Sequence, residues 1–231
     1  MKSTKKNRIL SSLAALLLVT IAAPKAEAAG TTPDTHAATV QLWITKHNTA
    51  CSGVFVAPSL ILTAKHCVVD GPYVEQNVRV YQSHAGQGEP IATADVVWYH
   101  EGSTRDNPDL ALLRTSGYSN WNYAPISRTA PVEGDRLQIC GVANRNDIYG
   151  GIGYNYCGNA SMSRMETYPT DYILSTPLLT ANRDSGGPAY NSRGQVVGIT
   201  HGDDWTSNYS TPLQDGTILY WLSLYGADTR F

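Results

Sequence analysis

Short apolar segments alternate with turn residues along most of the chain, and this pattern restricts it to folds made of many short strands. Val40, Leu42 and Ile44 occupy alternate positions, as in a strand with one buried face. The chain also contains 20 glycines and 12 prolines, and its 14 tyrosines outnumber its 2 phenylalanines. Because glycine and proline favour turns and tyrosine favours strands, we expect an all-β fold.

The expected strands fall into two groups. In the first half they cover 38–45, 53–56, 60–63, 78–81, 91–99 and 110–113. In the second half they cover 136–142, 154–162, 172–174 and 196–201, with a short helix over 218–224. The first group suits a small closed barrel, and the second half has a similar pattern of short strands separated by turns. We therefore predict two barrels that meet at a cleft.

The N-terminus has the features of a secretory signal. A basic head is followed by an apolar segment, 13–23, that is too short to span a bilayer. Ala26 and Ala28 place small residues at the two positions that a signal peptidase reads. We therefore expect cleavage after Ala28, which leaves residues 29–231 as a secreted domain; a membrane anchor is the alternative.

Charge argues against a nucleic-acid partner. The whole chain has 17 basic and 19 acidic residues, and the expected signal holds five of the basic residues and one of the acidic ones. The mature domain would then have 12 basic and 18 acidic residues, a net charge of −6. We therefore expect no nucleic-acid partner, because acidic domains bind nucleic acid poorly. We also expect a monomer that does not bind a membrane once the signal is removed.

The mature domain contains four cysteines, an even number that favours two disulfides in an exported protein. Three connectivities are open, and the spacing favours the local pairs Cys51–Cys67 and Cys140–Cys157. No Cys-x-x-Cys pair is present, and His36, His47, His84 and His100 share no metal-ligand spacing, so neither a metal nor a cofactor is expected.

Three motifs carry the chemistry. Ser185 lies in Asn-Arg-Asp-Ser-Gly-Gly-Pro, His66 in Thr-Ala-Lys-His-Cys, and Asp109 in Asp-Leu-Ala-Leu-Leu. A serine hydroxyl needs an adjacent base to become a nucleophile, and the order His, Asp, Ser is one of the known chain orders of a catalytic triad. Together these motifs resemble the chymotrypsin-like, or trypsin-like, serine peptidase family over nearly all of the chain after the signal.

The resemblance implies a fold and a set of roles. It implies two antiparallel six-stranded β-barrels, about 36–118 and 119–231, with a short C-terminal helix and the active site in the cleft between the barrels. Ser185 would be the nucleophile, His66 the general base and Asp109 the residue that orients the base. The backbone N–H groups of Ser185 and Arg183 would form the oxyanion hole, although family members usually have glycine where Arg183 stands.

The resemblance also implies substrate-binding residues. Leu179 and Thr180 would lie at the base and side of the primary specificity pocket, and neither is charged. Thr200 stands where a serine usually supports the triad aspartate, and its hydroxyl can donate in the same way. His201 and Gly202 follow it on the strand that pairs with substrate, and we expect His201 to form a wall of the cleft.

Two further features resemble the bacterial secreted members of the family, the α-lytic protease and streptogrisin group. They are the hairpin closed by Cys140 and Cys157 and the chain end from Thr211 to Gly226. The loose analogy with the bacterial hairpin makes Arg145 a candidate partner for Asp184.

The leading hypothesis is a secreted endopeptidase that acts on protein or peptide substrates. The alternatives are a catalytically weakened homologue that acts as a binding protein, because of Arg183, and a serine esterase.

Overall fold

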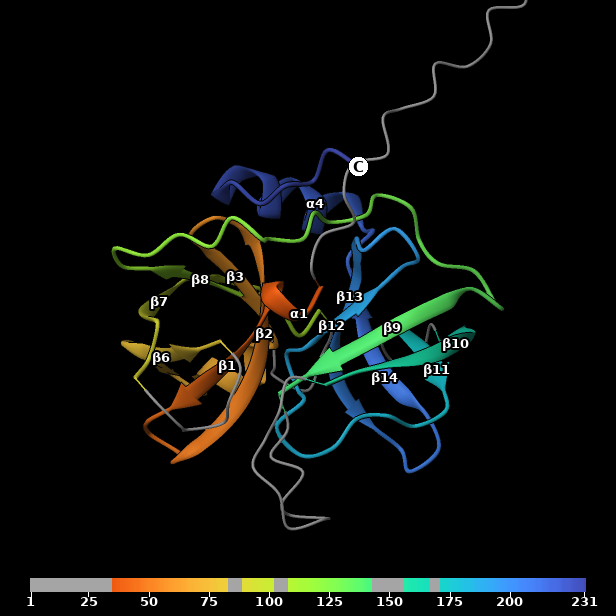
Figure 1. Ribbon diagram of the computed structural model, residues 1–231, viewed down its shortest axis with the longest axis horizontal. Coiled ribbons are helices and arrows are strands. Elements are labelled where there is room, and N and C mark those ends of the chain that lie inside the picture. Colours follow the sequence, from red (N-terminus) through yellow and green to blue (C-terminus); the bar gives the residue numbers. More distant parts are fainter. Residues whose placement is uncertain (1–34, 83–88, 102–107, 143–155, 167–170) are drawn as a thin grey trace, which may run out of the picture. The chain divides into compact units, whose positions relative to one another are not determined.

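The computed structural model describes residues 35–82, 89–101, 108–142, 156–166 and 171–231. Two closed barrels make up most of this part of the chain (Figure 1). Every pairing between the named strands is antiparallel. The predicted fold of two six-stranded antiparallel barrels is therefore confirmed.

The first barrel closes in the strand order β1-β2-β3-β8-β7-β6. Its strands are β1 (Thr39–Ile44), β2 (Thr49–Ala57), β3 (Leu60–Thr63), β6 (Val78–Tyr81), β7 (Ala92–Tyr99) and β8 (Ala111–Thr115). A short helix, α1 (Thr35–Ala38), precedes β1 and includes Ala38, which the sequence pattern assigns to the first strand. Helix α2 (Lys65–Val68) follows β3, and the small hairpin of β4 (Val69–Asp70) and β5 (Tyr73–Val74) follows α2.

The second barrel closes in the strand order β10-β11-β14-β13-β12-β9. Its strands are β9 (Arg136–Gly141), β10 (Tyr156–Glu166), β11 (Tyr172–Thr176), β12 (Pro188–Tyr190), β13 (Val196–Asp203) and β14 (Asn208–Pro212). The sequence pattern does not predict β12, because it is only three residues long and begins at the proline of the serine motif.

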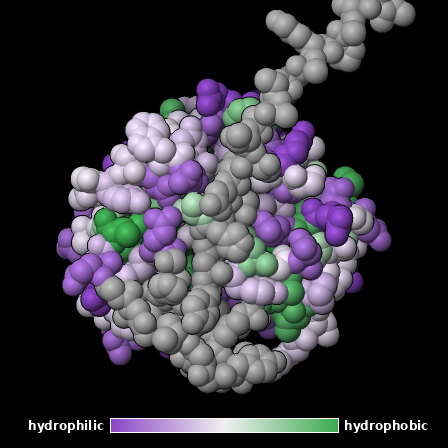
Figure 2. Space-filling view, viewed as in Figure 1, coloured by the Kyte–Doolittle hydropathy of each residue, from purple (hydrophilic) through white to green (hydrophobic). Residues whose placement is uncertain are grey.

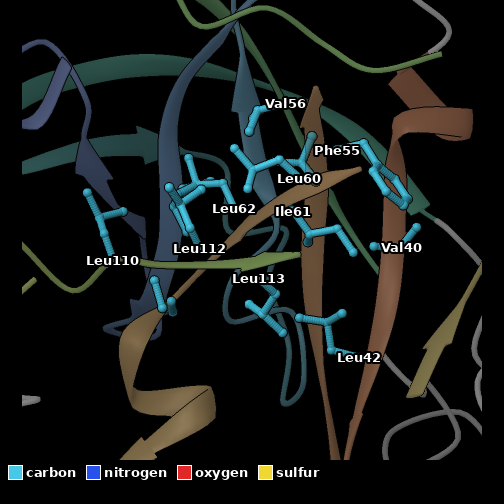
Figure 3. Close-up of a cluster of buried hydrophobic side chains, with 14 of the residues drawn as sticks. Val40, Leu42, Phe55, Val56, Leu60, Ile61, Leu62, Leu110, Leu112 and Leu113 are labelled. Carbon is cyan, nitrogen blue, oxygen red and sulfur yellow. The ribbon is translucent and has the colours of Figure 1, made fainter. Parts of the chain in front are cut away.

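Figure 3 draws part of the larger buried cluster, which is made mainly of branched aliphatic side chains and Phe55 of the first barrel. The same cluster continues to Tyr190, Val196 and Ile199 of the second barrel. Strand β2 is buried along almost its whole length, although its sequence includes Thr49, Ser52 and Gly53 beside the apolar residues. The second barrel has a smaller core, made of Leu137, Ile139, Ala160, Met162, Ile173, Ala189 and Val197. The alternating apolar residues of the sequence thus fill two barrel interiors, as the all-β prediction requires.

Helix α4 (Gly216–Tyr225) is fixed at both ends by its sequence. Asp215 is the N-cap and accepts hydrogen bonds from the N–H groups of Thr217 at 2.8 Å and Ile218 at 3.1 Å. Gly226 ends the helix in the left-handed conformation, with φ of 97°. The predicted helix is therefore confirmed, and it begins two residues earlier and ends one residue later than the pattern indicates.

The described surface has no single broad apolar face in the view of Figure 2, where hydrophobic side chains form small separate patches among hydrophilic ones. Within the described residues, no helix is both long and apolar enough to cross a bilayer. The expected signal, residues 1–28, lies outside the described residues.

Candidate active site

The pairing of β3 with β8 brings His66 and Asp109 together. Thr63 at the end of β3 pairs with Ala111 at the start of β8. His66 follows β3 in helix α2, and Asp109 directly precedes β8, so two residues far apart in the sequence leave adjacent strand ends. Ser185 comes from the second barrel, in the loop between β11 and β12.

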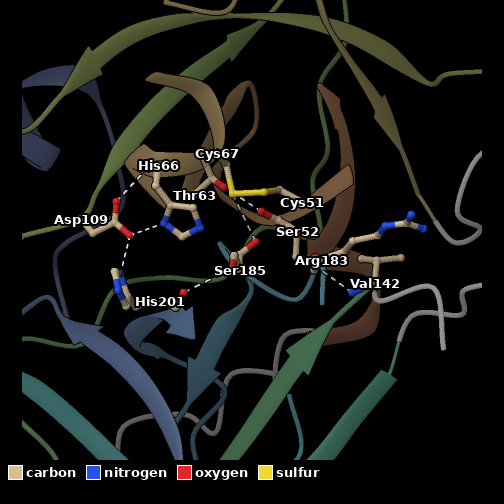
Figure 4. The surroundings of a disulfide bond; sticks show 10 residues. All are labelled: Cys51, Ser52, Thr63, His66, Cys67, Asp109, Val142, Arg183, Ser185 and His201. Atoms are coloured by element: carbon tan, nitrogen blue, oxygen red, sulfur yellow. Dashed lines mark hydrogen bonds and ion pairs between the residues drawn. A yellow bond between two sulfur atoms is a disulfide. The ribbon is translucent and has the colours of Figure 1, made fainter. Parts of the chain in front are cut away.

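Asp109 holds His66 by two hydrogen bonds (Figure 4). The backbone N–H of His66 donates to Oδ1 at 2.9 Å, and its ring Nδ1 lies 2.6 Å from Oδ2. Because an ionised carboxylate only accepts, His66 Nδ1 carries the proton and Nε2 is left as the basic atom of a neutral ring. Asp109 is therefore in contact with both the backbone and the ring of His66.

A second imidazole shares the same carboxylate. His201 Nδ1 lies 2.7 Å from Asp109 Oδ2, the oxygen that also accepts from His66. Asp109 has no exposed surface. Burial raises the pKa of this carboxyl, but the hydrogen bonds from His201 and His66 outweigh it and hold the pKa well below its usual range.

This arrangement differs from the predicted roles of Thr200 and His201. The Thr200 hydroxyl is buried and makes no hydrogen bond among the described residues, so it does not support Asp109. His201 contacts Asp109 instead of only lining the cleft. The cause is a β-bulge: Thr200 pairs with Ser210 and Gly202 with Tyr209, which leaves His201 as the extra residue whose side chain is redirected.

In Figure 4, Ser185 lies beside the His66 ring, on the side away from Asp109. Its hydroxyl donates a hydrogen bond to the backbone carbonyl of His201 at 3.2 Å. An open cavity of about 610 Å³ contains Ser185 and His66 in its wall. Its other lining residues are His47, Thr49, Ala50, Cys51, Cys67, Val69, Asp70, Asn182 and Arg183. The predicted nucleophile and base thus face the same solvent-accessible space.

The backbone around Ser185 is fixed by both barrels. The N–H of Ser52 in β2 donates to the Ser185 carbonyl at 2.8 Å. From the second barrel, the Gly186 N–H donates to the Thr200 carbonyl at 2.8 Å, and the Thr200 N–H donates to the Gly187 carbonyl at 2.7 Å. The serine loop is therefore held at the junction of the barrels and not left as a free surface loop.

Arg183 adopts the left-handed backbone conformation, with φ of 82°. This is the region that glycine occupies most easily, which accounts for the glycine that family members have here. The buried Ser52 hydroxyl donates to the Arg183 carbonyl at 3.0 Å and accepts from the Val142 N–H at 2.8 Å. Ser52 thus fixes the peptide after Arg183. The sequence gives no sign of this role beyond the position of Ser52 next to Cys51.

Asp184 turns away from the cleft. Its carboxylate accepts a hydrogen bond from the Ala181 N–H at 2.9 Å and packs so closely against Gly141 that a Cβ there would collide with it. The small residue at 141 thus makes room for the acid. Arg145, the predicted partner of Asp184, lies outside the described residues.

The predicted specificity residues lie on one wall of the second barrel. Asn208 Oδ1 accepts hydrogen bonds from the N–H groups of Leu179 at 2.7 Å and Thr180 at 3.0 Å. Leu179 also packs on the core of the second barrel. Gly202 is at the end of β13 with open space where a Cβ would stand. The buried Asn208 therefore anchors this segment, a contact that the sequence pattern does not indicate.

The two predicted disulfides, Cys51–Cys67 and Cys140–Cys157, are confirmed. The first joins β2 to α2, with the Cα atoms 6.2 Å apart, and so braces the turn that carries His66. The second joins residues that are opposite one another on β9 and β10.

His66, Asp109 and His201 also form a group whose potential metal-ligand atoms lie within 4.8 Å of one another. The hydrogen bonds from the two Nδ1 atoms to Asp109 already account for this grouping. A metal ion between them would have to displace both ring protons from a fully buried carboxylate. We therefore interpret the group as a hydrogen-bonded network.

Solved structures share the fold. A Glu endopeptidase in complex with MPD is 19% identical, with a TM-score of 0.66 over 86% of this chain and 94% of its own. Neuropsin, a serine protease expressed in the limbic system of mouse brain, is 19% identical, with a TM-score of 0.64 over 84% of this chain and 96% of its own. The Rv3671c protease from M. tuberculosis, in its active form, is 20% identical, with a TM-score of 0.59 over 84% and 82%.

Among curated proteins, no sequence matches the chain. The family model of the trypsin-like peptidase domain matches residues 51–199. This range contains His66, Asp109 and Ser185, and it begins at the cysteine that braces the histidine turn. With the two barrels and the His66–Asp109 contact in place, the chain belongs to the family of trypsin-like peptidases.

Proposed function

We propose that the protein is a secreted serine endopeptidase that cleaves peptide bonds through an acyl-enzyme at Ser185. The observation that carries this proposal is the 2.6 Å hydrogen bond between His66 and Asp109, beside a cleft that Ser185 and His66 line together. Family membership supports a peptidase, and the site supplies a nucleophile, a base and an orienting acid.

The reaction begins when Ser185 attacks the scissile carbonyl carbon. The serine hydroxyl first turns from the His201 carbonyl toward His66, a rotation about χ1 between staggered positions. His66 Nε2 takes the hydroxyl proton as the Oγ–carbon bond forms, and then gives this proton to the leaving amine as the carbon–nitrogen bond breaks. Asp109 keeps the His66 ring oriented and stabilises its charged form.

Water then replaces the leaving amine. His66 removes a proton from the water, the hydroxide oxygen attacks the acyl carbon, and the proton returns to Ser185 as the acid product leaves. In both steps the tetrahedral oxyanion would accept hydrogen bonds from the backbone N–H groups of Ser185 and Arg183. The Ser52 hydroxyl, which holds the Arg183 carbonyl, would keep this loop in place.

Export fits the chemistry of the domain. Its two disulfides are typical of oxidising compartments, and the N-terminal sequence has the pattern of a secretory signal. We infer that protein or peptide chains are the substrates, with uncharged side chains favoured before the scissile bond because Leu179 and Thr180 offer no countercharge.

Labelling by a fluorophosphonate probe tests the nucleophile directly. The purified mature protein should be labelled, and Ser185→Ala should not. Casein hydrolysis together with labelling would support the endopeptidase. Labelling with hydrolysis of small esters alone would indicate an esterase instead, and an unlabelled wild-type protein would indicate a homologue that only binds.

A further inference from the structure

Asp109 receives hydrogen bonds from two histidines that belong to different barrels. His66 follows β3 of the first barrel, and His201 lies on β13 of the second. Their Nδ1 atoms are 2.6 Å and 2.7 Å from the same carboxylate oxygen. Figure 4 shows the carboxylate of Asp109 between the two rings. Two N–H donors on one oxygen fix the carboxylate more firmly than either does alone.

The position of His201 is built into the second barrel. The bulge between Thr200 and Gly202 redirects the side chain out of the regular alternation of β13. The ring then packs against two others, that of His66 at 5.4 Å and that of Tyr172 at 5.2 Å between centroids. The His201 side chain keeps 29% of its surface exposed, so it is packed in place but still borders solvent.

Three titratable side chains of the described residues contact the His201 ring. Asp109 and His66 face it from the first barrel, and Tyr172 faces it from β11. Tyr172 in turn packs against Tyr209, whose hydroxyl donates to Asp204 at 2.9 Å. Asp109 is therefore the acid that the His201 ring contacts. Asp204 is separated from this ring by Tyr172 and Tyr209.

We propose that His201 is a positioning residue of the catalytic site, which holds Asp109, and through it His66, in the arrangement needed for proton transfer. This inference rests on the proposed function of Ser185, His66 and Asp109. His201 supplies the donor that the buried Thr200 hydroxyl does not supply, because that hydroxyl makes no hydrogen bond among the described residues. Its role depends on the Nδ1–H group and not on the bulk of the ring.

Two amide variants separate the donor from the bulk. In His201→Asn the amide nitrogen falls near the place of Nδ1, whereas in His201→Gln it falls near the place of Nε2. Both are polar and both remove the titrating ring, so their comparison does not depend on whether an apolar variant folds. His201→Leu removes the donor altogether. His100→Asn, at a ring that packs against Trp98, is the matched control.

The measurement is the second-order rate constant of fluorophosphonate labelling between pH 5 and 9, which does not require a known substrate. We expect His201→Leu and His201→Gln to be labelled at least about tenfold more slowly than wild type, since each loses a hydrogen bond to an ionised group. His201→Asn should recover to within about threefold of wild type, and His100→Asn should match it.

The pH profile gives a second measurement that a wall residue would not change. With one donor removed, the charge of Asp109 acts on His66 alone and favours its protonated form. The midpoint of the labelling profile should therefore move upward by about half a unit to one unit in His201→Leu, and by less in His201→Asn.

Equal labelling rates for the Asn and Gln variants, or a wild-type rate and midpoint in His201→Leu, would overturn the role of His201 while the proposed function stands. Failure of the function itself would look different: wild type would be unlabelled, or Ser185→Ala would be labelled as fast as wild type, and the His201 role would fall with it.

Discussion

Gly186 lies next to Ser185, the proposed nucleophile, and an added methyl group there should be strongly destabilising. Its φ is 86°, in the left-handed region, and a Cβ there would fall inside the contact distance of Thr63 Oγ1 and the Ser52 carbonyl oxygen. These two atoms are hydrogen-bonded to each other at 2.7 Å and belong to the first barrel. Gly186→Ala should therefore push the serine loop of the second barrel away from the first.

Gly71→Ala provides the matched control, because Gly71 also has a positive φ, 58°, but has open space around it. The left-handed conformation costs an alanine about 1–2 kcal/mol, and the stiffer unfolded chain returns about 0.4–1 kcal/mol. We expect Gly71→Ala to lose about 1 kcal/mol of unfolding free energy. The collision at Gly186 adds about 1–3 kcal/mol, for a loss of about 2–4 kcal/mol.

Urea unfolding of the oxidised proteins, followed by tryptophan fluorescence, measures both losses. Gly186→Ala should also reduce fluorophosphonate labelling in its folded state, because the displaced loop carries Ser185. Equal stability losses in the two variants would refute the reasoning, since backbone strain alone would then explain both.

Three further predictions concern Ser52, Asp109 and Asp215. Ser52→Ala leaves the buried Val142 N–H without its acceptor, so it should lower the unfolding free energy by about 2 kcal/mol. It should also slow labelling of Ser185, because the Ser52 hydroxyl holds the Arg183 carbonyl. Normal labelling of the folded variant would contradict a role of Ser52 in the oxyanion loop. Asp109 has a pKa below its ordinary 3.8, so its contribution to stability is present above that pH and is lost as the pH falls below it. The unfolding free energy of Asp109→Asn should thus fall less steeply than that of wild type from about pH 4 to pH 2, as acid titrations of both would show. Asp215→Ala removes the N-cap of α4 and should cost about 1 kcal/mol in the same urea assay, with labelling unchanged.

The sequence predicts best the strands whose apolar side chains are buried in a barrel core. Strand β3 is buried throughout and is predicted over its full length. For β2, which is also buried along most of its length, the prediction covers only 53–56 of nine residues. Strand β14 is harder, because Asn208, Ser210 and Thr211 are polar residues that lie buried in it. Their polar groups meet partners from other segments, as Asn208 does with Leu179 and Thr180, and periodicity carries no information about such partners.

The residues of the candidate site also differ in how well the sequence predicts them. The three motifs locate His66, Asp109 and Ser185, because each stands in a local sequence that resembles the family. The roles of Ser52 and His201 depend instead on contacts between barrels and on a bulge. A bulge inserts one residue into a strand, and this shift reverses which of the following side chains face inward. The hydrophobic pattern of the sequence does not show where such an insertion lies.

In the proposed mechanism, catalysis depends on how the two barrels pack around Ser185. Asp109 and His66 come from the first barrel, while Ser185 and His201 come from the second. Each pair is held by its own barrel, but the distance between the pairs depends on bonds that cross the junction, from His201 to Asp109 and from Ser52 to the serine loop. A substitution that loosens this junction therefore changes the relation of nucleophile to base without unfolding either barrel. Fluorophosphonate labelling should accordingly be lost at a lower urea concentration than the native tryptophan fluorescence, which includes that of Trp43 in β1 and Trp98 in β7 of the first barrel.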